Sequence, residues 1–66
     1  MKQLFNTDYV LWDKANDSLY QDSYGRIIIF GDKKEAEEDC CGNEYVTSCT
    51  DLPKKHYEIL IKQINN

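Results

Sequence analysis

Arg26-Ile27-Ile28-Ile29-Phe30-Gly31-Asp32 is the stretch that decides the fold, because it joins the most apolar run of the chain to a helix start. Its four consecutive large apolar residues predict a central strand at residues 26–30 that is covered on both faces. Gly31 and Asp32 are typical of a strand end followed by a helix N-cap. The chain therefore changes here from strand to helix.

A short surface helix is expected directly after this stretch. The Asp32 carboxylate suits an N-cap, and Glu35 completes a capping box with it. We expect the helix to run from Lys33 to about Cys41, with Gly42 as a left-handed C-cap. Six of its nine residues are charged, so most of its surface faces solvent.

Upstream of residues 26–30, the sequence predicts two more strands and two turns. Tyr9–Trp12 is β-branched and aromatic, which favours a strand. Residues 14–17 form a turn that leads into a return strand at Ser18–Gln21. Residues 22–25 form the next turn, which ends in a glycine. The three strands make an antiparallel meander.

Downstream of the short helix, we expect a fourth strand at Tyr45–Cys49 and a final helix. Asp51-Leu52-Pro53 opens that helix, because proline suits a first helical turn. Its apolar residues recur with helical spacing, at Tyr57, Leu60, Ile61 and Ile64. The predicted fold is α+β with the order β-β-β-α-β-α. An antiparallel sheet of three to four strands carries the C-terminal amphipathic helix on one face.

Length and composition allow one domain over residues 1–66, with an ordered core at about 7–64. Hydrophobic residues are 41% of the chain and charged residues 30%, as in soluble globular domains. No apolar run approaches the roughly 20 residues that span a membrane. The N-terminus turns polar too early for a signal peptide. We therefore expect a cytoplasmic location without a membrane partner.

The formal net charge of −4 is unevenly distributed. Residues 32–51 hold seven acidic side chains and two lysines, a balance of −5, whereas residues 52–66 hold three lysines and one glutamate, a balance of +2. An acidic chain is not expected to bind nucleic-acid phosphates directly. The distribution predicts a polarised surface.

Three cysteines and one histidine, Cys40, Cys41, Cys49 and His56, together make a ligand set that zinc accepts. However, the spacing lacks a C-x₂-C knuckle, and the odd number leaves a cysteine without a disulfide partner. The alternative is that Cys40 and Cys49 are small buried apolar residues and Cys41 ends a helix. We expect no cofactor and no metal.

His56 lies beside Lys54 and Lys55, near the start of the final helix. One interpretation is a small basic contact patch for an acidic surface or a phosphate. The other is a solvated helix face with Lys54, Glu58 and Lys62 at i, i+4 spacing. For catalysis, the serines lack a recognisable nucleophile motif and no glycine-rich phosphate loop is present. We expect no enzyme.

The aromatic residues are the other informative set. We expect the final helix to cover one face of the sheet and the other face to stay open. Trp12, Tyr20 and Tyr24 then mark a protein-binding surface, because such residues dominate interface hot spots. The alternative is that the tryptophan and the tyrosines cover the edge of the core.

The chain resembles a pattern common in small bacteriophage-encoded proteins. The pattern consists of a short hairpin, a G-x-I-x-x-F strand, a helix that contains Glu-Ala, and a Leu-Pro helix. It is carried here by Tyr9-Val10-Leu11-Trp12-Asp13, Tyr24-Gly25-Arg26-Ile27-Ile28-Ile29-Phe30, Lys33-Lys34-Glu35-Ala36-Glu37 and Leu52-Pro53. The resemblance implies a phage or mobile-element origin. It also implies an accessory factor that binds and inhibits a host protein, a class that includes anti-CRISPR and other anti-defence proteins.

Together these features predict a small non-enzymatic inhibitor or modulator of a larger host or phage protein. If the partner handles nucleic acid, acidic side chains imitate phosphates in its basic groove. The residues expected to do so are Glu35, Glu37, Glu38 and Asp39. Two alternatives remain open. One is a homodimeric structural module that associates through the open sheet face, and the other is a zinc-stabilised small domain.

Overall fold

β1 (Tyr9–Asp13) is the central strand of the sheet in the computed structural model, which describes residues 2–66. β2 (Ser18–Leu19) and β3 (Glu44–Ser48) pair with it in antiparallel fashion on its two edges, in the order β2-β1-β3. α1 (Lys33–Asp39) and α2 (Lys54–Ile64) complete the domain. This arrangement confirms the predicted α+β fold.

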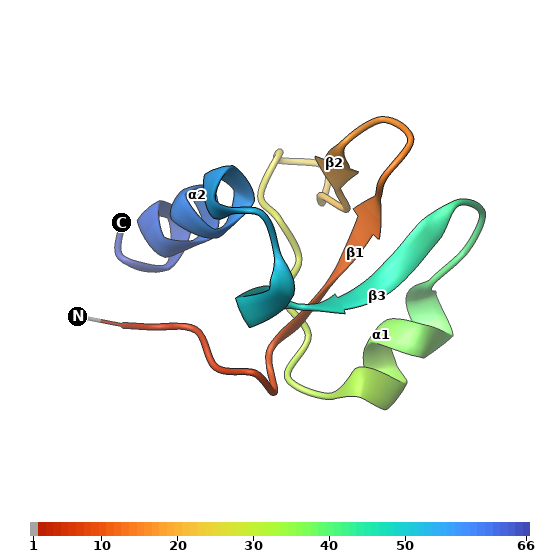
Figure 1. Ribbon diagram of the computed structural model, residues 1–66, viewed down its shortest axis with the longest axis horizontal. Coiled ribbons are helices and arrows are strands. Elements are labelled where there is room, and N and C mark those ends of the chain that lie inside the picture. Colours follow the sequence, from red (N-terminus) through yellow and green to blue (C-terminus); the bar gives the residue numbers. More distant parts are fainter. Residues whose placement is uncertain (1) are drawn as a thin grey trace.

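The two helices lie on opposite sides of the sheet (Figure 1). β3 and α2 are joined by a 3₁₀ turn at Cys49–Asp51. This turn explains why β3 ends before the predicted boundary at Cys49. β2 is also shorter than predicted: it ends at Leu19, whereas the predicted strand ends at Gln21. None of the helices within residues 2–66 has the length and apolarity that crossing a membrane requires.

The predicted central strand at residues 26–30 is wrong, because this segment is extended but makes only isolated bridges. Its backbone contacts join Gln21 to Ile27, Tyr20 to Ile28 and Tyr9 to Phe30. The physical reason is competition for one edge of β1. β2 pairs with Trp12 and Asp13, at the C-terminal end of β1. Residues 26–30 therefore contact the residues that follow β2 first, and reach β1 only at its start, where Phe30 pairs with Tyr9.

A side-chain amide fastens this segment to α2. The backbone N–H of Ile27 donates to Gln63 Oε1 at 2.9 Å, and Gln63 Nε2 donates to the Ile27 carbonyl at 2.8 Å. The amide thereby satisfies the same two backbone groups that a neighbouring strand would satisfy. One side chain of α2 thus pairs with the backbone of Ile27 in place of a strand.

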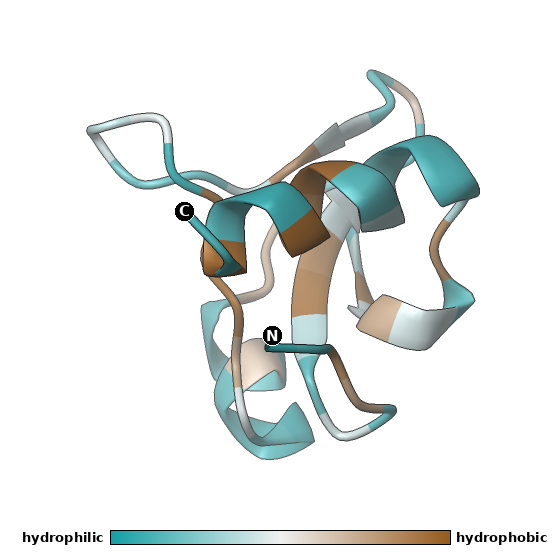
Figure 2. Ribbon diagram, turned by 90° about the vertical axis from the view of Figure 1, so that its left-hand side faces the viewer, coloured by the Kyte–Doolittle hydropathy of each residue, from teal (hydrophilic) through white to brown (hydrophobic). Residues whose placement is uncertain are grey.

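The larger core cluster lies between the sheet and α2. Val10, Cys49 and Leu60 are fully buried in it, and the helix packs through the predicted face. Figure 2 shows apolar stretches, in brown, along both α2 and the strand behind it. The other buried members are Leu4, Leu19, Ile27 and Leu52, with Trp12, Ile29, Tyr57, Ile61 and Ile64 packed against them.

A second cluster on the other side of the sheet contradicts the expectation of an open face. Leu11 and Ala36 are fully buried there, together with Phe30. Because the Ala36 side chain is small, α1 can lie close to the sheet despite having a single buried residue. A helix expected to be too small to cover this face therefore covers it.

α1 is shorter than predicted, since it ends at Asp39 and not near Cys41. Cys40 is already extended, and its Sγ donates to the Glu44 carbonyl at 3.1 Å. Gly42 has the expected positive φ, 63°. It lies in the turn that enters β3, however, and is not the residue that caps the helix.

Candidate functional site

The candidate site is the acidic surface of α1, which we define by Glu35, Glu37, Glu38 and Asp39. All four side chains are exposed. The helix begins at Asp32, whose carboxylate accepts a bond from the Lys34 N–H at 3.2 Å. In Figure 2 the helix is hydrophilic along most of its length. The sequence prediction therefore placed these four carboxylates correctly on a solvent-facing helix.

The acidic surface is not neutralised by ion pairs within residues 2–66. The ion pairs in this part of the chain lie elsewhere, between Lys54 and Glu58 and between Asp17 and the start of α2. Exposed carboxylates without cationic partners maintain their field in solution. The four charges are therefore available to a basic surface on another molecule.

The predicted aromatic residues do not gather into one surface. Trp12 is half-buried in the larger cluster, where its ring meets the His56 ring edge-on with centroids 6.0 Å apart. Lys14 Nζ lies 5.2 Å from the Trp12 ring centroid. Tyr20 and Tyr24 are exposed, by 39% and 88%. Trp12 packs on the α2 side of the sheet, opposite α1, so the predicted partner-binding set is divided.

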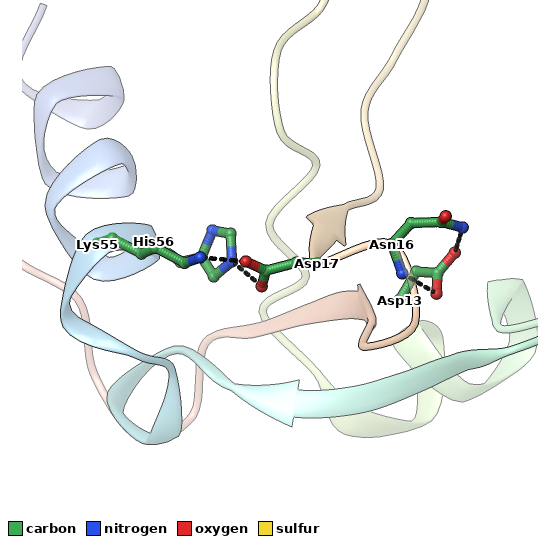
Figure 3. A network of polar contacts seen from close by, with 5 residues as sticks. All are labelled: Asp13, Asn16, Asp17, Lys55 and His56. Carbon is green, nitrogen blue, oxygen red and sulfur yellow. Dashed lines mark hydrogen bonds and ion pairs between the residues drawn. The ribbon is translucent and has the colours of Figure 1, made fainter.

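A polar network that the sequence did not reveal joins the β1–β2 turn to α2 (Figure 3). The Asp17 carboxylate accepts bonds from Lys55 Nζ and from His56 Nε2, the latter at 2.8 Å. Because an ionised carboxylate can only accept, His56 Nε2 carries the proton. The bonds from Lys55 and then His56 lower the pKa of Asp17 to about 2.

His56 is buried, with 7% of its surface exposed, so it does not belong to an exposed basic patch. His56 and Leu60 are four residues apart, about one helical turn, so the sequence places both on the same face of α2. This spacing indicates that His56 is buried together with Leu60. The contact with Asp17 had no such signal, because the two residues lie 39 positions apart. The network fixes the hairpin turn against the helix.

The four residues of the zinc alternative lie in different environments. Cys49 is fully buried, and burial and Asp8 raise the pKa of its thiol to about 12. Burial also raises the pKa of Cys40, whereas Cys41 is exposed. His56 is hydrogen-bonded to Asp17 in the β1–β2 turn. Among residues 2–66 no three acidic, cysteine or histidine side chains are grouped as a metal would require.

The two helices, which lie on opposite sides of the sheet, differ in net charge: α1 has four acidic side chains and two lysines, and α2 has three lysines and one glutamate. α1 carries the acidic surface, and α2 carries Lys54, Lys55 and Lys62. Comparison of the chain with models of protein families, with curated proteins and with solved structures gave no match. The candidate site therefore consists of four exposed carboxylates on one helix.

Proposed function

We propose that the protein is a non-enzymatic binding domain that inhibits or modulates a larger protein. In this proposal the acidic surface of α1 contacts a basic surface of the partner. One observation supports it above the others: the four carboxylates are all exposed, and none forms an ion pair within the described chain. Charges arranged in this way steer encounter and select partners.

The packing of α1 supports this role because it makes the helix a rigid carrier. Ala36 is fully buried against the cluster that contains Leu11 and Phe30, and Asp32 caps the first turn. A seven-residue helix would be unstable alone in water. Because the sheet already orders it, binding costs less conformational entropy.

The class of partner follows from the chemistry of the surface. A basic groove that normally holds nucleic acid attracts closely spaced anions, and carboxylates on successive turns supply them. We propose such a nucleic-acid-handling protein as the partner, in a phage or mobile-element setting. The domain then acts by occupying the groove and excluding the nucleic acid.

The experiment begins with capture of a partner by the tagged protein and continues with affinity measurements on the purified pair. Glu37→Lys with Glu38→Lys reverses two charges of the acidic surface. The matched control combines Glu58→Lys with Gln21→Lys and Asn66→Lys, which changes the net charge equally at exposed positions away from α1 and β3.

We expect the α1 variant to weaken binding by more than about tenfold, since close interfacial charge pairs contribute more than 1.4 kcal/mol. The control variant should change affinity much less. Circular dichroism checks that both variants retain the wild-type fold. Equal affinities for the wild type and the α1 variant would contradict the proposal.

A further inference from the structure

β3 is an edge strand, and the hydrogen bonds of β1 show which of its backbone groups face outward. Tyr9 exchanges two backbone bonds with Phe30, at 2.8 and 2.7 Å, on the side of β1 away from β3. The Leu11 carbonyl accepts from the Tyr20 N–H on that same side. In an antiparallel ladder such residues form non-hydrogen-bonded pairs with the opposite strand.

The partners of these two β1 residues are Ser48 and Val46. Because they do not bond to β1, the N–H groups of both residues and the carbonyl of Val46 point away from the sheet. The Ser48 carbonyl already accepts the first bond of the 3₁₀ turn at Cys49–Asp51. The ladder bond from the Cys49 N–H to the Asp8 carbonyl, at 2.8 Å, fixes the same alternation. Glu44 also faces outward, but its carbonyl already accepts from Cys40 Sγ.

The edge at Val46 and Ser48 lacks several of the devices that usually protect an edge strand. β3 contains no lysine and no proline, and its register with β1 runs through five pairs without a bulge. A depression of about 530 Å³ lies beside it, lined by Asn6, Tyr9, Lys33, Val46, Ser48, Thr50 and Asp51. An unprotected edge with space beside it favours the addition of another strand.

Charge selects the occupant of this edge. Residues 40–53 contain Glu44 and Asp51 but no lysine or arginine. The bond from Cys40 to Glu44 also places the end of α1, with its carboxylates, beside the start of β3. A second copy of the chain would bring two acidic edges together, which like charges oppose. A basic extended segment meets acidic side chains near both ends of β3, Glu44 and Asp51, against one lysine, Lys33, in the lining of the depression.

We propose that the open edge of β3 binds an extended basic segment of the partner as an added strand. Backbone bonds to Val46 and Ser48 hold the segment, and its lysine or arginine side chains face the acidic residues of α1. This inference rests on the proposed function and specifies the kind of partner segment that it requires.

Ser48 offers a closely matched test of the backbone contact. Its φ of −62° already suits proline, and its N–H points away from β1. Ser48→Pro therefore removes one outward donor and places a ring carbon on the edge. The hydroxyl that donates to the Asn6 carbonyl is lost as well. Ser48→Ala loses the same hydroxyl but keeps the N–H, so it is the control.

The probe is a capped eight-residue peptide of alternating lysine and valine, and its counterpart replaces every lysine with glutamate. Two-dimensional amide NMR titrations follow β3. We expect the lysine peptide to shift the amides of residues 44–48, and the glutamate peptide to leave them unchanged. Ser48→Pro should weaken binding about tenfold relative to Ser48→Ala, through the lost bond and the steric block.

A second variant keeps the test valid if Ser48→Pro fails to fold. At 66 residues the chain is accessible to chemical synthesis, and N-methylation of Val46 removes its outward donor with the side chain intact. Equal peptide binding by the blocked and control proteins, or no binding of the lysine peptide at millimolar concentration, would overturn the inference. Loss of partner binding in the α1 variant alone would leave the proposed function standing without the strand addition.

Discussion

Asp17 connects the β1–β2 turn to the start of α2 through one side chain. It has a positive φ of 52° in the β1–β2 turn, and its carboxylate accepts bonds from Lys55 and His56 at the start of α2. Aspartate tolerates this left-handed conformation better than most residues. The turn therefore places a charge where the helix presents two donors.

The pKa of Asp17 makes a pH-dependent contribution to stability. Its value is about 2 in the folded protein against 3.8 for an ordinary aspartate. Because the pKa of Asp17 is lower in the folded protein than in the unfolded chain, its ionised carboxylate stabilises the fold above pH 3.8. This stabilisation is lost as the pH falls toward 2. We expect Asp17→Asn to lower the melting temperature at pH 5 and to have a smaller effect at pH 2. Circular dichroism melts at both pH values measure this, and an equal difference at both would contradict it.

The cysteines differ in reactivity because they differ in burial. Cys41 is exposed, whereas Cys49 is fully buried with its pKa raised to about 12. Thiolates are the reactive form, so brief treatment with iodoacetamide at pH 8 should label Cys41 first and leave Cys49 unmodified. In denaturant all three cysteines should react. Peptide mass spectrometry identifies the labelled site, and early labelling of Cys49 would show that its cluster is open.

At the scale of the elements, the sequence predicted the helices better than the strands. The spacing of Tyr57, Leu60, Ile61 and Ile64 identified the packing face of α2, because helical periodicity depends on local sequence. The apolar run at 26–30 correctly indicated burial, but it did not reveal its pairing. Pairing depends on which segment reaches an edge of β1, and that choice is made by residues distant in the chain.

The link between α2 and the extended segment is testable at Gln63. Its side-chain amide makes two bonds to the backbone of Ile27. Gln63→Ala should lower the free energy of unfolding by about 1–3 kcal/mol, because two hydrogen bonds are lost. The exposed neighbour provides the control, Lys62→Ala, which should change stability by less than about 0.5 kcal/mol. Urea unfolding measures both, and equal losses would show that the amide bonds do not stabilise the fold.

At the scale of the whole molecule, the sequence indicated charge polarity but not its geometry. The balance of −5 over residues 32–51 and +2 over residues 52–66 is visible in the composition. Only the fold shows that α1 and α2 lie on opposite sides of the sheet (Figure 1). It also corrects the expectation of an open sheet face, because Ala36 of α1 is buried in one cluster with Leu11 of β1. The candidate surface is therefore the outside of α1.

The most direct measurement is the ionic-strength dependence of association with the captured partner. Four neutral substitutions, Glu35→Gln, Glu37→Gln, Glu38→Gln and Asp39→Asn, remove the acidic surface and keep side-chain size. Screening weakens steering between opposite charges, so the wild-type association rate should fall steeply as salt rises. The variant should associate more slowly at low salt and depend on salt far less. Identical rates and identical salt dependence for the two proteins would contradict the role of α1.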